Sequence, residues 1–103
     1  MKTEIRGKHF EVSVRLREYI EKETQKLKQF YEPILDTRIT LERENRMYRV
    51  EIVVHVHSHI LKATDEQDAV HPALGGAIDK MVRQLKRVKE RQRRPRVPAA
   101  ERN

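Results

Sequence analysis

The chain has 103 residues, of which 37% are apolar and 38% charged, so we expect a single small domain with a thin core. It has no cysteine, which excludes disulfides and thiol chemistry, and no apolar run approaches the roughly 18 residues of a membrane span. The net charge of +7 predicts nucleic acid or an acidic membrane surface as partner, and without a signal-peptide core we expect a soluble intracellular protein.

The first third of the chain predicts a strand followed by a helix. Residues 2–8 alternate in polarity, which is typical of a strand with one polar face. Ser13 is a suitable N-cap for a helix from Val14 to about Tyr31, and Pro33 ends that helix. The buried stripe predicted for this helix consists of Leu16, Tyr19, Ile20, Leu27 and Phe30.

Three strands are predicted in the middle of the chain. Residues 34–43 alternate, with an inward face of Leu35, Thr37, Ile39 and Leu41. A turn at residues 44–46 leads to the clearest strand, at 47–57. Its inward face consists of Tyr48, Val50, Ile52, Val54 and Val56. Ser58 and His59 then turn the chain into a short strand at 60–64.

The last helix has a clear apolar seam, and its sequence allows two starting points. The acidic residues 65–68 are interpreted as its start or its approach, and Pro72 and the glycines at 75 and 76 then interrupt the pattern. It begins either as a weak turn near residue 68 or firmly at Ala77. Its apolar seam consists of Ile78, Met81, Val82, Leu85 and Val88. Beyond Val88 the seam fails, so the helix end should project from the domain.

This order of elements predicts an α+β fold of β-α-β-β-β-α type. The four-stranded sheet should contain an antiparallel meander and carry both helices packed on one face, leaving the other face wet. We expect residues 1–94 to form the single domain. We expect Pro95 and Pro98 to stop the helix and residues 95–103 to form a flexible basic tail.

The positive charge is concentrated in the last helix. Residues 77–103 contain ten lysines and arginines against three acids, whereas residues 1–76 are balanced. Opposite the apolar seam lies a row of like charges that we call the cation ladder: Lys80, Arg83, Arg87, Arg91 and Arg94. A plain solvated face remains the alternative, but such faces usually mix signs. Like charges one turn apart cost a few tenths of a kcal/mol each, which a polyanionic partner would offset.

A second basic line runs along the first helix and consists of Arg15, Lys22 and Lys26. It is another candidate phosphate contact, although acids nearby in the sequence can pair with it. If the two helices lie parallel on one sheet face, this line and the cation ladder border one continuous basic surface.

Other chemistry has little support. His55, His57 and His59 suggest zinc, but the strand turns before His59, so we interpret them as polar cover of the sheet. There is no phosphate-binding glycine loop, no nucleophile–base–acid set and no ribonucleoprotein-type aromatic motif. We therefore predict neither an enzyme, nor a cofactor, nor a metal site.

Two runs of sequence resemble the bacterial ribosome hibernation promoting factor family. The first run comprises residues 5–13, IRGKHFEVS, followed by residues 16–20, LREYI. The second lies in the last helix, DKM at 79–81, RQLKR at 83–87 and KE at 89–90. That family includes the ribosome-associated translation inhibitor and was once described as a sigma-54 modulation protein. The resemblance covers about residues 2 to 91.

The resemblance implies a fold like a double-stranded-RNA-binding domain and a role in translation. Family members bind the small ribosomal subunit between head and body, contact 16S ribosomal RNA, and occupy the places of mRNA and of A- and P-site tRNA. The implied protein is cytoplasmic and ribosome-associated, monomeric when free, and has the 70S ribosome as partner during stress or stationary phase. The family's basic positions correspond to Lys22, Lys26, Arg83, Lys86, Arg87, Lys89 and Arg91. Of these, Lys86 and Lys89 rest on the resemblance alone.

The sequence also departs from the family. Members usually begin the last helix with Asp-x-Tyr-Ala-Ala-Ile-Asp, but here His71 stands at the tyrosine place and Gly75 at an acidic place. The chain resembles the short form, which acts with a ribosome modulation factor to pair ribosomes, and the sequence does not decide whether it promotes or prevents pairing. Two alternatives remain: a stand-alone binder of structured RNA, and a protein-interaction modulator of a transcription factor.

Overall fold

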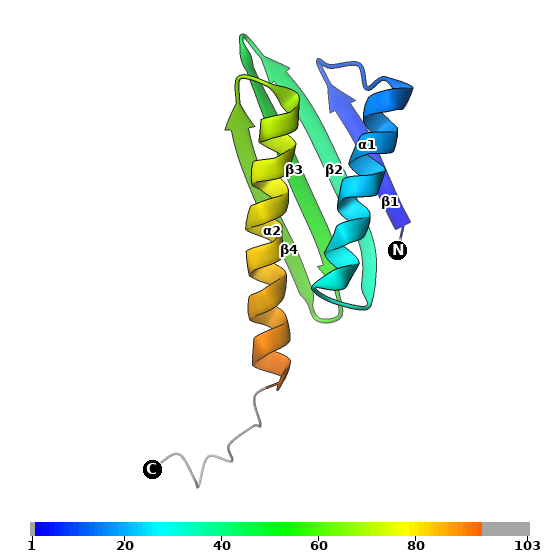
Figure 1. The fold of residues 1–103 in the computed structure, drawn as a ribbon, viewed down its shortest axis with the longest axis vertical. Helices are drawn as coiled ribbons and strands as arrows, with labels where there is room; N and C mark the ends of the chain where they lie inside the picture. The colour runs from blue at the N-terminus through cyan, green and yellow to red at the C-terminus, as the bar shows by residue number, and fades with distance from the viewer. Residues whose placement is uncertain (1, 94–103) are drawn as a thin grey trace, which may run out of the picture.

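The computed structural model describes residues 2–93, which form a four-stranded sheet with helices on one face (Figure 1). The elements in chain order are β1 (Lys2–Lys8), α1 (Val14–Gln25), the 3-10 helix η1 (Lys26–Gln29), β2 (Ile34–Glu44), β3 (Met47–Val56), β4 (His59–Gln67) and α2 (Val70–Arg93). The predicted α+β class and element order are confirmed. Arg94 and the predicted tail at 95–103 lie outside the described residues.

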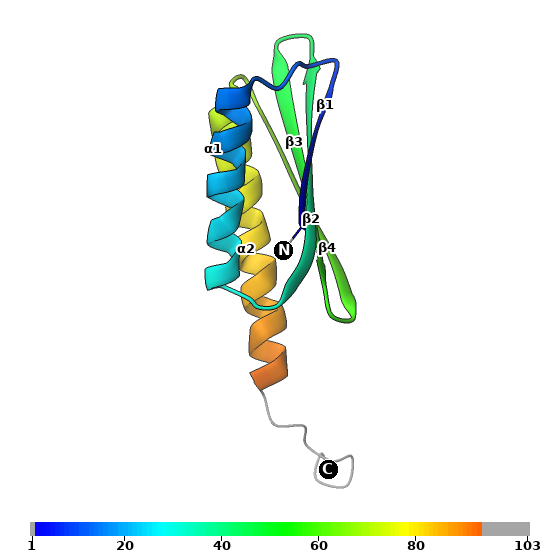
Figure 2. The ribbon, with the colours of Figure 1, turned by 90° about the vertical axis from the view of Figure 1, so that its right-hand side faces the viewer.

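The sheet has the strand order β1-β2-β3-β4. The predicted meander is confirmed, since β2, β3 and β4 pair antiparallel, with Ile39 opposite Ile52 and Ile52 opposite Ala63. β1 pairs parallel to β2, with Ile5 beside Ile39, because α1 returns the chain to the end of the sheet where β1 began. Both helices lie on the same face of the sheet, and the other face stays open (Figure 2).

The core lies between the sheet and the helices. Val50, Ile52 and Val54 point inward from β3 with no exposed surface, as their alternation with polar residues predicts. The seam of α2 meets them, and Met81 and Leu85 are fully buried. The last turns of α2 extend past the sheet (Figure 1), as the end of the apolar seam at Val88 predicted.

The first helix begins as predicted but ends earlier. The hydroxyl of Ser13 accepts a hydrogen bond from the backbone N–H of Leu16 at 3.1 Å, which caps α1. The α-helix ends at Gln25 and continues as η1, rather than reaching Tyr31. One physical reason is Thr24, whose buried hydroxyl donates to the carbonyls of Ile20 and Glu21 and competes with regular helix bonding.

The predicted stripe of the first helix is correct for Ile20 and Leu27, which are fully buried. Leu16 and Phe30 are half-buried against the core. The prediction that Tyr19 belongs to the stripe is wrong, because this residue is 36% exposed. It lies about 100° from Ile20 around the helix, at the flank that faces α2.

The start of β2 differs from the predicted alternation. Ile34 is buried and Leu35 is 57% exposed, the reverse of the predicted inward position of Leu35. The strand pairing shifts between Ile34 and Asp36, and such a bulge moves the alternation by one residue. Beyond it, Thr37, Ile39 and Leu41 face inward as predicted.

The fourth strand is longer than predicted and replaces the expected approach to the helix. β4 runs to Gln67, with Asp65 opposite Val50 and Glu66 opposite Arg49. Cross-strand pairing thus overrides the weak strand propensity of the acidic residues. The turn before β4 is at residues 57–58 rather than 58–59, and Ser58 has a φ of 70° there.

The last helix begins at Val70, near the earlier of the two predicted starts, and both glycines lie inside it. The alternative start at Ala77 is wrong because Leu74 is already buried in the core. The close packing of α2 on β4 explains why residue 76 is a glycine. A Cβ at this position would lie 2.6 Å from the Cγ of Asp65 on β4, so any larger residue would have to displace the Asp65 carboxylate.

We predict opposite effects for alanine at the two neighbouring glycines. Gly75→Ala should stabilise the domain by about 0.5–1 kcal/mol, because a Cβ there has open space and alanine favours helix. Gly76→Ala should destabilise it, because Asp65 must move away from its partners. Urea unfolding of the two variants checks this, and equal midpoints would contradict the close packing of α2 on β4.

Candidate nucleic-acid interface

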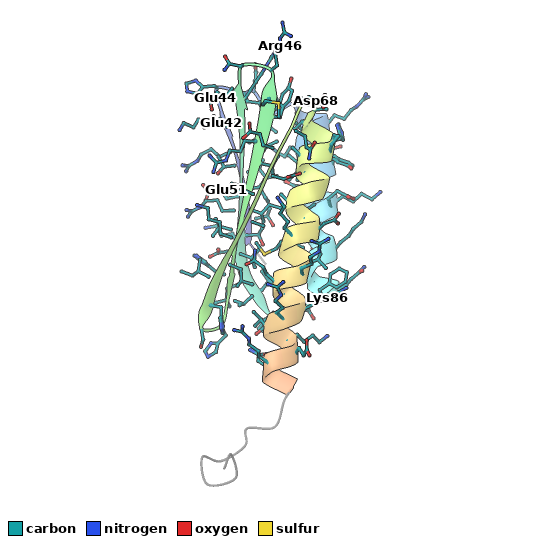
Figure 3. All side chains as sticks on the ribbon, turned by 90° about the vertical axis from the view of Figure 1, so that its left-hand side faces the viewer. Glu42, Glu44, Arg46, Glu51, Asp68 and Lys86 are labelled. Atoms are coloured by element: carbon teal, nitrogen blue, oxygen red, sulfur yellow. The ribbon has the colours of Figure 1, made fainter. Side chains whose placement is uncertain are left out.

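The two layers of the domain differ in charge. The helices α1, η1 and α2 carry twelve lysines and arginines against five acids, whereas β2, β3 and β4 carry four against six. Figure 3 shows Glu42, Glu44 and Glu51 on the sheet layer and Lys86 on α2. The helix layer therefore presents the positive field that attracts a polyanion.

The flank of α2 that faces β4 holds the start of the cation ladder. The ammonium of Lys80 donates to the carbonyl of Thr64 at 2.8 Å and to Asp65 Oδ1 at 3.1 Å. The amide of Gln67 donates to the same carboxylate, and this bond, with the Lys80 ammonium, lowers the pKa of Asp65 although partial burial opposes the shift. Lys80 therefore holds the helix to the strand, a role that the sequence did not indicate.

Arg83 and Arg87 lie on this flank beside Gln84, which donates to the carbonyl of Lys62 at 2.6 Å. They border a shallow hollow of about 390 Å³. Arg83, Arg87 and Arg91 are exposed, and within residues 2–93 no ion pair joins them to a carboxylate. Their charge is available to a partner.

The opposite flank of α2 faces η1. Lys86 and Lys89 line a hollow of about 260 Å³ there, with Gln29, Phe30 and Glu90. The ammonium of Lys86 lies 5.2 Å from the centroid of the Phe30 ring. These two lysines do not belong to the cation ladder, and they lie on the flank of α2 that borders η1.

The predicted continuous surface is therefore wrong on its α2 side. Lys80, Arg83 and Arg87 face β4, so they do not line the space between the helices. A helix advances 100° per residue, which places Lys86 and Lys89 on the other flank. Helical periodicity alone predicts neither which flank of α2 meets β4 nor which meets η1, because that depends on how α2 is rotated on the sheet.

The basic line of the first helical segment divides into two kinds of residue. Arg15 and Lys22 are exposed and have no ion pair in the described part of the chain. Lys26 pairs with Glu23 at 2.7 Å, and this hydrogen bond and charge raise the pKa of Lys26. The alternative that nearby acids pair with this basic line is therefore correct for Lys26, which lies in η1 and not in α1.

The sequence also missed an aromatic contact between the helices. The rings of Tyr19 on α1 and His71 on α2 have centroids 4.7 Å apart and are tilted by 52°. The position of Tyr19 at the edge of the predicted stripe was the available signal. No signal in the sequence placed His71 beside it.

The histidine run offers no metal centre in the part of the chain that the structure describes. His55 Nδ1 lies 3.0 Å from Asp36 Oδ1 on the open sheet face. His59 Nδ1 lies 3.5 Å from the carbonyl of His57.

No helix within residues 2–93 is long and apolar enough to cross a membrane.

Known proteins resemble this chain in sequence over most of its length. Residues 3–93 match the family model described as Sigma 54 modulation protein / S30EA ribosomal protein. The ribosome hibernation promoting factor of Salmonella typhimurium is 31% identical over 91 residues, which cover 88% of this chain and 96% of the relative. The ribosome hibernation promotion factor of Deinococcus radiodurans is 30% identical over 93 residues, 85% of this chain but 49% of the relative.

Two solved structures have the same fold. The N-terminal domain of Thermus thermophilus Protein Y superimposes with a TM-score of 0.80 at 24% identity, covering 85% of this chain and 99% of that one. A ribosomal subunit interface protein from Coxiella burnetii superimposes with a TM-score of 0.77 at 22% identity, covering 87% and 99%.

Proposed function

The chain belongs to the Sigma 54 modulation protein / S30EA ribosomal protein family, and from that premise we propose that it is a ribosome hibernation factor. It binds the small ribosomal subunit through its helix layer and holds the ribosome inactive during stress or stationary phase. It is cytoplasmic and ribosome-associated. Relatives named ribosome hibernation promoting factor, about 30% identical over most of the chain, support the hibernation role.

The observation that carries the proposal is the set of exposed cations on the helices. Arg15 and Lys22 on α1 and Arg83, Arg87 and Arg91 on α2 have no carboxylate partner within residues 2–93. Each cation that contacts a phosphate of 16S rRNA releases counterions, which supplies affinity without reading sequence. Lys86 and Lys89 extend this surface toward η1.

We further propose that the bound domain occupies the decoding channel and excludes mRNA and A- and P-site tRNA. This action requires affinity and shape only, because a body in the path of tRNA inhibits translation without chemistry. The same proposal includes that the bound chain promotes the pairing of ribosomes, alone or with a ribosome modulation factor.

Co-sedimentation tests the proposal. The chain should travel with small subunits and 70S ribosomes in a sucrose gradient, and deacylated tRNA should displace it in proportion to tRNA concentration. A free chain at the top of the gradient would contradict ribosome binding. Binding that tRNA leaves unchanged would contradict the decoding-channel location alone.

A further inference from the structure

An exposed aromatic pair lies between the two helices. Tyr19 and His71 meet with ring centroids 4.7 Å apart, Tyr19 is 36% exposed, and His71 is also exposed. Neither ring is required for the apolar core, since Ile20 and Leu74 fill the adjacent core positions. Two aromatic rings held by different helices, each with accessible surface, thus form an exposed aromatic spot within a basic layer.

The phenylalanine rings and the other tyrosine rings of the described chain are more covered. Phe30 is half-buried and has Lys86 over its ring. Phe10 and Tyr48 pack edge to face with centroids 5.7 Å apart, and Arg43 lies 5.6 Å from the Tyr48 centroid. The pair of Tyr19 and His71 is therefore the one best placed to accept a further flat group.

The space beside the pair is open. Gly75 follows His71 by one helical turn and lies on the same flank of α2. A Cβ at Gly75 would meet no atom within 4 Å, so no side chain fills this part of the surface. A ligand can approach the α2 backbone here more closely than at any residue with a side chain.

The charges around the pair favour an anionic ligand on the α1 side. Arg15 precedes Tyr19 by four residues and Lys22 follows it by three, so both lie one turn from it on the same flank. Glu23, four residues after Tyr19, lies there too, but its charge is compensated by Lys26 at 2.7 Å. Both are exposed and have no ion pair within residues 2–93. On the α2 side, Asp79 lies one turn beyond Gly75, which disfavours phosphate there. The flat group should therefore lie over the rings with its phosphates toward α1.

We propose that Tyr19 and His71 form a stacking platform for an unpaired nucleobase of bound RNA, with Arg15 and Lys22 contacting the adjacent phosphates. This inference rests on the proposed function, which makes RNA the partner. Stacking accepts any base, because each has a flat face, and it favours single-stranded over paired segments. Stacking would thus add a preference for single-stranded RNA, which phosphate binding by the cations alone does not supply.

Fluorescence of 2-aminopurine tests the platform. A short single-stranded RNA with one central 2-aminopurine should be quenched on binding the full chain, and the same RNA in a duplex should not. Tyr19→Leu removes the aromatic ring but keeps an apolar side chain, and should weaken single-strand binding about tenfold and abolish the quenching. Tyr19→Phe should bind and quench like the unmodified chain. Equal affinity and quenching with Tyr19→Leu would overturn the inference.

Two further measurements distinguish loss of the stacking platform from loss of folding and from failure of the proposed function. Thermal unfolding of Tyr19→Leu should match that of Tyr19→Phe within a few degrees; if Tyr19→Leu unfolds, His71→Leu replaces it with the same expectation. Small-subunit co-sedimentation of the unmodified chain tests the proposed function by itself. If that chain binds subunits and neither leucine variant weakens binding to single-stranded RNA, the platform fails while the proposed function stands. If it does not bind subunits, the proposed function fails, and the quenching result still decides the platform.

Discussion

Raising the monovalent salt from about 50 mM to about 200 mM should weaken binding of the chain to small ribosomal subunits about a thousandfold. Ten lysines and arginines were predicted as contacts; Arg94 lies outside the described residues, and Lys26 and Lys80 are paired with Glu23 and Asp65. The remaining seven are Arg15, Lys22, Arg83, Lys86, Arg87, Lys89 and Arg91. About six phosphate contacts give a log–log slope near −5, and a fourfold rise in salt then costs about three orders of magnitude.

A salt series of equilibrium co-sedimentation measures this slope. The two ion-paired lysines should contribute least, since their charge is already compensated by an acid of the same chain. A slope between 0 and −1 would contradict the phosphate-based account, because binding would then depend on apolar or protein–protein contacts that salt hardly weakens.

The double substitution Arg83→Glu with Arg87→Glu should lower affinity for small subunits about a hundredfold or more. Each change removes a charged hydrogen-bonding group that is worth roughly 1.5–3 kcal/mol when it contacts phosphate, and adds a repulsive charge. Neither arginine packs in the core or pairs with a carboxylate within residues 2–93, so the fold should persist. Small-subunit binding at fixed salt, with unfolding midpoints measured in parallel, checks both expectations.

The matched control is Arg46→Glu with Arg49→Glu. Arg46 lies in the turn between β2 and β3, and Arg49 is exposed on β3 opposite Glu66. This pair changes net charge by the same amount but lies on the sheet layer, so binding should fall by less than about threefold, through the long-range field alone. Equal losses in the two double variants would show that net charge, rather than the helix layer, determines affinity.

Local patterns predicted most of the fold. The alternation in residues 47–57, the cap at Ser13 and the seam from Ile78 to Val88 each have a physical signature within one element. The structure confirms the alternation up to Val56, the cap, and the burial of every seam residue except Val82, which is half-buried. The failures lie where tertiary contacts decide. The bulge before Asp36, the continuation of β4 through Asp65, and Gly76 inside α2 all depend on neighbouring elements that no local window contains.

In the candidate site, too, local sequence features were predictable and tertiary contacts were not. The sequence identified the cations and the helices that carry them, because charge and helical periodicity are local. It did not show that Lys80 is held by Asp65, which lies fifteen residues away on β4. It also could not assign Lys86 and Lys89 to the flank beside Phe30, since the rotation of α2 on the sheet is a packing property.

The most direct test of the account is site-specific photocrosslinking on small subunits. A photoreactive residue at Lys86, on the helix layer, should crosslink to 16S rRNA, whereas one at Val53, which alternates with the inward residues of β3, should not. Crosslinks to rRNA from position 53 and none from position 86 would contradict the claim that the helices face the RNA.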